Sequence, residues 1–360
     1  MPALLDPGAL DGAFNLARRR VDDGTIPFSV LGVAGADGVV RLDAFSPADG
    51  PRIGTGAVCL LASITKPIVA TMVARLVSEG RFSLTEPLGR WLPELDAAGL
   101  APFTAWHVLT HTTGIPDIDL EALLLRGGTR ADVLRETIGI GQVSAPGSTF
   151  LYASFTFDLL AEAIGRHLDR PFEELVRETV LEPLGMTETG FEPVSAAVEA
   201  GRVAPVQVGG WDGTLRPETA AMPVEVAVRA FSSLHLAGGG IWSSASDLLR
   251  FGRAMLRGGE LDGVRVLGPR ILDLFTREVT VNGLGAKPNH LEDEHYAIGW
   301  GKRGSASPGS PSAFGIGGIT GTRLWVDPAH DLVIVFLTGV WGLGSPIPDG
   351  QVLAVYAALA

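Results

Sequence analysis

The sequence lacks the features that mark several classes of protein. It has one cysteine in 360 residues, Cys59, which rules out an intramolecular disulfide. A net charge of -12 gives no basic excess for binding nucleic acid or an anionic membrane. No apolar run approaches the length of a membrane span, and residues 1–7 lack the basic and apolar parts of a secretion signal. We therefore expect a cytoplasmic protein whose partners are small molecules, with no nucleic acid or membrane partner; the oligomeric state stays open.

Several cofactor and nucleophile motifs are also absent. There is no Gly-x-Ser-x-Gly nucleophile elbow, no P-loop and no dinucleotide-binding fingerprint. His107 and His111 are four residues apart, but no glutamate follows His107 as it does in the zinc-binding His-Glu-x-x-His pattern. Cys59 lies among apolar neighbours, which is typical of a small buried residue rather than a reactive thiol. We expect neither a metal nor a cofactor.

The composition is instead that of an ordered fold of enzyme size with a large core. It is 46% hydrophobic, and its 47 glycines and 24 prolines are dispersed along the chain, which indicates many turns. Asp37-Gly38 predicts a hairpin turn between strands at 27–33 and 39–45. Further strands are predicted at 297–302, 313–316, 322–326 and 332–337. Helices are predicted from Asp6 or Pro7 to Val21 and over 63–78, 133–138, 155–167, 172–181, 248–256 and 352–359, with Ser246 capping the helix at 248–256.

These elements predict an α/β (α+β) fold with an antiparallel sheet flanked by the two terminal helices. The region from about residue 84 to 236 is mainly helical, whereas the predicted strands lie before and after it. We therefore predict a sheet domain formed by residues 1–83 and 237–360, with a helical domain, 84–236, inserted into it. The active site is expected at their junction.

A serine and a lysine at the start of the helix over 63–78 form the candidate reactive centre. Ser63 and Lys66 are three residues apart, so a helical turn brings their side chains onto the same face. A serine hydroxyl is a poor nucleophile until a partner takes its proton. Burial disfavours the charged form of a lysine, so the apolar neighbours Ile68 and Val69 make Lys66 a candidate base.

Four other sequence stretches form a set of motifs together with this serine and lysine. They are LTHTTGIP at 109–116, PGSTFLYAS at 146–154, PLGM at 183–186 followed by Thr189, and GGGIWSSASDL at 238–248. Together with Ser63-Ile64-Thr65-Lys66, they resemble the serine β-lactamase and penicillin-binding-protein-like superfamily. The resemblance covers residues 32–338 and is greatest to the branch that holds class C β-lactamases, carboxylesterases, D-aminopeptidases and transesterases. It implies the β-lactamase/transpeptidase-like fold.

The resemblance also implies roles for individual residues. Ser63 resembles the family's nucleophile, Lys66 its activating lysine, and Tyr152 the tyrosine of the Tyr-x-Asn motif. A phenol beside Lys66 can relay a proton between Ser63 and the leaving group. By the same resemblance, the backbone N–H groups of Ser63 and Ile319 form the oxyanion hole, whose donors stabilise the charge of the tetrahedral intermediate.

Two positions depart from the family pattern and bear on the substrate. Ser154 stands where the family has the asparagine that contacts a substrate amide. Ile316 stands where a lysine or histidine normally precedes the glycines, here Gly317 and Gly318, and isoleucine cannot bind a substrate carboxylate. We also consider these glycines substrate-binding, because they let a strand approach the acyl group closely. Arg323 is the nearest candidate to replace the missing cation.

The sequence therefore predicts a serine hydrolase that acts on a small-molecule carboxylic ester through an acyl-Ser63 intermediate. One alternative is a transesterase or amide-forming acyltransferase, whose acceptor is an alcohol or amine instead of water. A second is a β-lactamase or D-amino-acid peptidase, which the missing cation disfavours. A third is a catalytically silent ligand-binding protein, but the joint presence of Ser63, Lys66 and Tyr152 argues against decay of the site.

Overall fold

A six-stranded antiparallel sheet forms the centre of the protein. The computed structural model describes residues 8–50, 52–208, 221–222, 224–279, 295–302, 308–343 and 346–359. The strand order is β2-β1-β12-β11-β10-β9. The strands are β1 (Ser29–Ala34), β2 (Val39–Phe45), β9 (Gly301–Lys302), β10 (Phe314–Gly317), β11 (Arg323–Asp327) and β12 (Leu332–Leu337). The predicted antiparallel sheet and the hairpin of β1 and β2 are confirmed.

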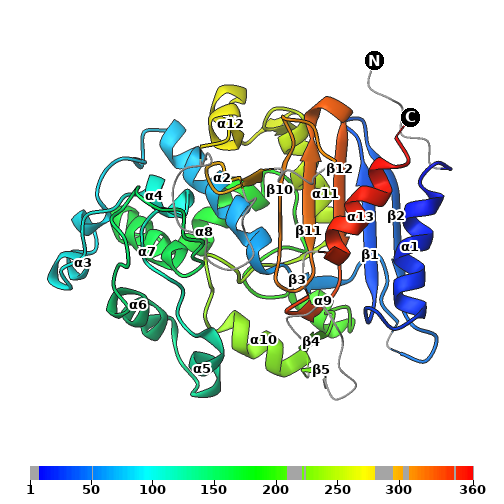
Figure 1. The fold of residues 1–360 in the computed structure, drawn as a ribbon, viewed down its shortest axis with the longest axis horizontal. Coiled ribbons are helices and arrows are strands. Elements are labelled where there is room, and N and C mark those ends of the chain that lie inside the picture. The colour runs from blue at the N-terminus through cyan, green and yellow to red at the C-terminus, as the bar shows by residue number, and fades with distance from the viewer. Residues whose placement is uncertain are drawn as a thin grey trace.

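Helices cover both faces of this sheet. The terminal helices α1 (Asp11–Asp22) and α13 (Pro346–Tyr356) lie side by side on one face (Figure 1), and α11 (Ala245–Leu256) packs on the other. Along β12, Ile334 and Phe336 join the cluster under α1 and α13, whereas Val333 and Val335 join the cluster under α11. Successive strand residues point to opposite faces, so a strand covered on both sides is apolar throughout. Each such side chain contributes roughly 1.5–3 kcal/mol when fully buried.

The middle of the chain is mainly helical, as predicted. In Figure 1, helices α3, α4, α6 and α7 gather at the opposite end of the molecule from α1 and β2. The helices of this region are α3 (Pro93–Ala97), α4 (Ala105–Leu109), α5 (Leu120–Leu125), α6 (Arg130–Gly139), α7 (Thr156–Leu168), α8 (Phe172–Val176), α9 (Ser195–Glu199) and α10 (Val224–Ser232), with a π-helical turn, η3 (Arg177–Leu181), after α8 and a short 3₁₀ turn, η2 (Leu88–Arg90), before α3.

Three small sheets and two further helices complete the described fold. The helix α2 (Thr65–Ser78) is buried along most of its length, and α12 (Pro269–Thr276) packs against it. The small sheets pair β3 (Val58–Leu60) with β6 (Trp242–Ser244), β7 (Glu260–Leu261) with β8 (Val264–Arg265), and β4 (Val206–Val208) with both β5 (Ala221–Met222) and β13 (Val340–Trp341). A 3₁₀ turn, η4 (Pro328–His330), joins β11 to β12.

Some predicted element ends were wrong. Ser244, not Ser246, caps α11, because its side chain accepts the Asp247 N–H. The strand predicted over 297–302 is reduced to β9, since the chain bends through Gly299, where φ is +75°. The last helix, α13, begins and ends earlier than the predicted 352–359. The start predicted at Asp6 or Pro7 lies outside the described residues, and α1 begins at Asp11.

One hydrophobic cluster extends from the sheet into the helical region. It includes Val335 of β12, Val69 of α2 and Leu160 of α7. The proposed division of the chain at residues 83 and 237 stays a prediction. Within the ranges that the structure describes, no helix has both the length and the apolar character needed to cross a membrane.

Candidate active site

Ser63 lies at the entrance to α2, in a turn that neighbouring strands hold in place. The strand β3 pairs with β6, and Leu61 continues this pairing by donating its N–H to the Ile241 carbonyl at 2.9 Å. The hydroxyls of Thr320 and Thr322 donate to the carbonyls of Leu60 and Leu61, both at 2.9 Å. The following 3₁₀ turn, η1 (Ala62–Ile64), begins with Ala62 at φ +50°, a conformation that costs a non-glycine residue roughly 1–2 kcal/mol. The surrounding bonds therefore hold a strained turn that presents Ser63.

Lys66 is fully buried on the first turn of α2, directly beside Ser63. Its Nζ lies 3.0 Å from Ser63 Oγ, 3.1 Å from Ser154 Oγ and 2.7 Å from the Gly238 carbonyl oxygen. It also lies 4.8 Å from the centre of the Tyr152 ring. Each of the amine's hydrogen-bonding positions therefore has a defined partner.

Tyr152 approaches Ser63 from the loop before α7. Its hydroxyl donates to Ser63 Oγ at 2.8 Å, so Ser63 lies between an amine and a phenol. The structure thus brings together the three side chains that the sequence proposed as a catalytic unit. Their catalytic roles stay predictions.

His111 contacts the loop that carries Tyr152 and supports it. Its ring stacks on the Tyr152 ring with 4.3 Å between centroids, its Nδ1 accepts the Ala153 N–H at 3.2 Å, and its carbonyl accepts the Leu151 N–H at 2.7 Å. Burial and the positive charge of Lys66 hold the pKa of His111 well below its ordinary value. The ring is therefore neutral near pH 7. The structural role expected for His111 is thus specifically to brace Tyr152.

Ser154 links Lys66 to a carboxyl group that the sequence analysis did not single out. Asp117 Oδ1 accepts the N–H groups of Ser154, at 2.5 Å, and of Phe155, at 3.1 Å, at the start of α7. Desolvation raises the pKa of Asp117, partly offset by these N–H groups and by the charge of Lys66. In place of the family's asparagine, Ser154 Oγ contacts the amine; its contact with substrate stays a prediction.

Gly318, directly after β10, packs another backbone segment against the turn that presents Ser63. A Cβ on Gly318 would lie 2.3 Å from the Leu61 carbonyl oxygen and 3.3 Å from Ala62 Cβ, so only glycine fits against this turn. Ile319 directly follows Gly318, whose backbone packs against the turn that presents Ser63. The predicted donation by the Ser63 and Ile319 N–H groups remains a prediction.

Ile316 stands where the family has a cation, and Arg323 is the candidate to replace that cation. The two residues lie on opposite faces of the sheet. Ile316 is 5% exposed and belongs to the hydrophobic cluster that includes α2. Arg323 on β11 lies opposite Gly317 and forms an ion pair with Asp349 of α13. The structure therefore gives Arg323 a partner on the α13 face, and its role in binding substrate stays a prediction.

Asp158 is a second carboxyl group near Lys66 that the sequence analysis did not single out. It lies on α7 with no exposed surface, and Oδ1 accepts the Ala237 N–H at 2.9 Å. Burial raises the pKa of Asp158 to about 7, although the charges of Arg130 and Lys66 act in the opposite direction. Its place between Phe157 and Leu159 was the available signal, because an aspartate in an apolar helix is rarely buried without a purpose.

Comparison with known proteins shows the family of the chain. The family model described as Beta-lactamase matches residues 14–357. The chain belongs to this family.

Two relatives align with most of this chain. Protein Rv1367c of Mycobacterium tuberculosis (strain ATCC 25618 / H37Rv) is 32% identical over 324 residues, which are 77% of this chain and 76% of that protein. Esterase EstB of Burkholderia gladioli is 31% identical over 338 residues, 82% of this chain and 81% of EstB. These similarities place the chain among β-lactamase-like serine hydrolases, a group that includes an esterase.

The fold is also that of solved members of the group. The structure of EstCE1, described as a hydrolase with promiscuous acyltransferase activity, superposes with a TM-score of 0.80 at 20% sequence identity. The superposition covers 97% of this chain and 99% of EstCE1. At this identity the likeness shows the fold alone.

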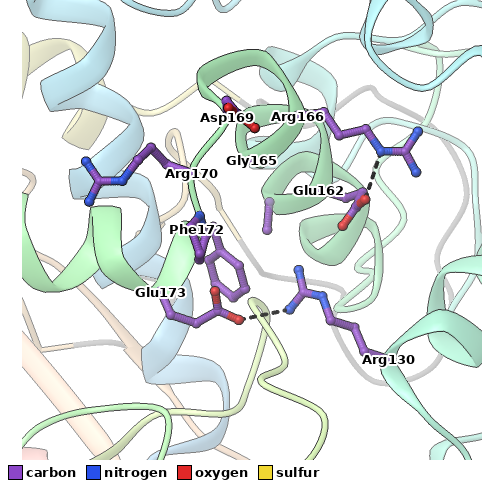
Figure 2. A pocket seen from close by; sticks show the side chains of 10 residues that line it. Arg130, Glu162, Gly165, Arg166, Asp169, Arg170, Phe172 and Glu173 are labelled. Atoms are coloured by element: carbon purple, nitrogen blue, oxygen red, sulfur yellow. Dashed lines mark hydrogen bonds and ion pairs between the residues drawn. The ribbon is translucent and has the colours of Figure 1, made fainter.

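A separate hollow of about 360 Å³ lies between α6, α7 and α8 and is not lined by Ser63, Lys66 or Tyr152. Figure 2 shows Arg130 pointing toward Glu173 and Arg166 toward Glu162. Arg170, which also lines it, forms ion pairs with Glu174 and Glu178. Carboxylates pair with these three arginines, so the ion pairs argue against the hollow as an anion site.

Neither the histidines nor the cysteine form a second reactive centre in the described part of the chain. No group of three or more His, Cys, Asp and Glu side chains is arranged there to hold a metal ion. Cys59 is buried in β3, and burial raises the pKa of its thiol to about 12. A thiol with so high a pKa is a poor nucleophile at neutral pH.

Proposed function

We propose that this protein is a serine hydrolase that cleaves carboxylic esters through an acyl-Ser63 intermediate. The observation that carries the proposal is the position of Ser63 Oγ, 3.0 Å from Lys66 Nζ and 2.8 Å from Tyr152 Oη. These are the distances at which a base can take the proton of an attacking hydroxyl. The three groups act as one unit that moves this proton.

In the first half of the reaction, Ser63 Oγ attacks the ester carbonyl carbon while its proton passes to the Lys66 and Tyr152 unit. The N–H groups of Ser63 and Ile319 stabilise the oxygen that becomes negative. The tetrahedral intermediate then collapses, its bond to the alkoxy oxygen breaks, and the departing alcohol receives the proton from Lys66 and Tyr152. Ser63 is left as an ester of the acyl group.

In the second half, a water molecule replaces the departed alcohol. The same unit takes a proton from this water as its oxygen attacks the acyl carbon. Collapse of the second intermediate breaks the bond to Ser63 Oγ, which recovers its proton, and the carboxylic acid leaves. An alcohol or amine acceptor would use the same groups and give a new ester or amide, and product analysis with candidate acceptors separates this transferase activity from hydrolysis.

The ester preference rests on Ile316. β-Lactams and D-alanyl peptides carry a carboxylate, and a buried isoleucine at this position offers it no charge or hydrogen bond. A simple ester needs no such partner. The similarity to Esterase EstB over 81% of its length supports the same substrate class.

Turnover of p-nitrophenyl acyl esters, nitrocefin and D-Ala-D-Ala peptides tests this proposal in one series. We expect the highest kcat/KM for the p-nitrophenyl esters. Faster cleavage of nitrocefin or of the peptides would overturn the ester preference. An enzyme inactive on all three that also resists labelling by a fluorophosphonate would support a silent ligand-binding protein.

A further inference from the structure

The buried carboxyl group of Asp158 lies on the far side of a short backbone segment from Lys66. Asp158 Oδ1 accepts the Ala237 N–H at 2.9 Å, and the next residue, Gly238, accepts a hydrogen bond from Lys66 Nζ at 2.7 Å. Among the described residues, Oδ2 of Asp158 is buried without a hydrogen-bond partner. A buried polar atom left unpaired costs roughly 1–3 kcal/mol, which calls for a compensating role.

Gly238 has little freedom to adopt another position. A Cβ there would lie 2.3 Å from the Ser154 carbonyl oxygen, so the segment is packed closely against the start of α7. On its other side, the carbonyl of His235 accepts a hydrogen bond from Arg130 at 2.9 Å. The Asp158 bond fixes the Leu236–Ala237 peptide. The carbonyl of this peptide accepts the Gly239 N–H at 3.1 Å, and that N–H belongs to the same peptide as the Gly238 carbonyl.

The direction of the Gly238 carbonyl matters because of how an uncharged amine forms hydrogen bonds. Such an amine has two N–H donors and one lone pair. If Gly238 and Ser154 accept the two hydrogens, the lone pair points to Ser63, which is the arrangement a base needs. A displaced Gly238 carbonyl would release one hydrogen and let the amine turn away from Ser63.

We propose that Asp158 is a positioning residue for Lys66, acting through its hydrogen bond to Ala237 and the orientation this gives the Gly238 carbonyl. The inference rests on the proposed function, in which Lys66 is part of the proton-transfer unit. Asp158 itself does not touch the reacting atoms.

The charged groups around Asp158 are consistent with this role. Lys66, Arg130 and Asp117 act on it electrostatically, the first two favouring its ionised form and Asp117 opposing it. Its pKa of about 7 means that both protonation states are populated near neutral pH. Oδ1 can accept the Ala237 N–H in either state, because a proton can reside on Oδ2. An asparagine can therefore reproduce the hydrogen bond.

Three variants separate the hydrogen bond from the charge. Asp158→Asn retains an acceptor in place without the charge, Asp158→Glu retains the charge but displaces the acceptor, and Asp158→Ala removes both. Asp247→Ala is the matched control, since Asp247 is also buried, accepts backbone and hydroxyl donors and has a raised pKa, but belongs to α11. The readouts are kcat, KM and the pH profile for p-nitrophenyl acetate, with the rate of fluorophosphonate labelling.

We expect kcat to fall about 100-fold in Asp158→Ala and Asp158→Glu, the size of effect that a 1 Å misplacement of a reacting group can cause, with KM little changed. Asp158→Asn should restore kcat to near the wild-type value, and the Asp247→Ala control should keep it. The same kcat in all variants would overturn the proposal. A kcat that is low in Asp158→Asn but near the wild-type value in Asp158→Glu would also overturn it. If Asp158→Ala does not fold, the comparison of kcat between Asp158→Asn and Asp158→Glu still tests the proposal.

A crystal structure of Asp158→Glu or Asp158→Ala provides a readout that does not depend on activity. The proposal predicts that the Gly238 carbonyl moves away from Lys66 Nζ, and an unchanged 2.7 Å contact would overturn it. A wild-type protein without esterase activity or labelling would instead disprove the proposed function, whereas an active wild type with unaffected Asp158 variants would disprove only the positioning role.

Discussion

Two buried aspartates on different parts of this molecule have opposite hydrogen-bonding states. Asp327, at the end of β11, accepts hydrogen bonds on both carboxylate oxygens, from Ser310, Ala329, His330 and Tyr356. Asp158, behind Lys66, has one bonded oxygen and one without a partner in the described part of the chain. Both side chains have no exposed surface.

The difference also appears in their pKa values. Burial by itself raises the pKa of Asp327, but hydrogen bonds from Ser310, Tyr356 and His330 outweigh it and the net shift is downward. Burial dominates at Asp158 and raises its pKa to about 7. A fully bonded carboxylate stabilises a fold, whereas an under-bonded one beside a reactive lysine is typical of a functional site. The comparison separates a cluster that ties α13 to the sheet from a cluster beside Ser63, the proposed nucleophile.

The largest effect should come from removing the lysine of the reactive cluster. Lys66→Met keeps the length of the side chain but cannot take a proton, so we expect kcat for esters to fall about 100- to 10,000-fold. The matched change in the structural cluster, Asp327→Ala, should leave kcat near wild type while reducing the free energy of unfolding by roughly 2–3 kcal/mol, since it leaves buried donors unpaired. Steady-state kinetics and urea unfolding of both variants give the two quantities; an active Lys66→Met would contradict the account.

Two neighbouring glycines at the end of β10, Gly317 and Gly318, sharpen the comparison at the proposed oxyanion hole. A Cβ on Gly318 meets the backbone of Leu61 at 2.3 Å, whereas one on Gly317 meets the flexible end of Arg323 at 2.9 Å. Gly318→Ala should therefore displace the Ile319 N–H and lower kcat about 100- to 1,000-fold, the cost of one lost oxyanion donor. Gly317→Ala should lower kcat less, because the flexible end of Arg323 can shift to admit the added Cβ. Equal kinetics for the two variants would argue against an oxyanion role for Ile319.

The smallest effect is a difference in how stability depends on pH. The lowered pKa of Asp327 adds stability above its unfolded value near 3.9, and this stability is lost as the pH falls through the folded pKa. The raised pKa of Asp158 works the other way, because the folded state holds the proton more tightly between about pH 4 and 7 and stability falls as the pH rises through that range.

Urea unfolding at pH 4 and pH 8 tests these opposite signs. Relative to wild type, Asp158→Asn should gain free energy of unfolding at pH 8, whereas Asp327→Asn should lose it there. The same sign of change in both variants would show that the two carboxyl groups are not in the contrasting states described here.

The elements that could be predicted from the sequence are those fixed by local pattern. The apolar run at 332–337 and the Asp37-Gly38 turn determine strands whatever lies around them, and β12 and the hairpin appear where expected. The predicted cap of α11, Ser246, was wrong, because Ser244 and Ser246 are both good caps and the pairing of β6 with β3 decides between them.

The same distinction holds for the site. Ser63 and Lys66 meet within one helical turn, so their spacing predicts the contact, and Tyr152 was placed by resemblance to a family. Asp158 and Ala237 are 79 residues apart, and Asp117 and Ser154 are 37 apart. No local pattern reports such contacts, since they depend on how α7 packs against two loops. The carboxyl groups around Lys66 therefore emerged only from the structure.

The most direct test of the central claim is intact-mass measurement of the protein after reaction with a fluorophosphonate or an activated ester. We predict a single adduct on the wild type, located at Ser63 by peptide mapping, and none on a folded Ser63→Ala variant. An unmodified wild type, or an adduct that persists in Ser63→Ala, would contradict the claim that this serine carries the acyl group.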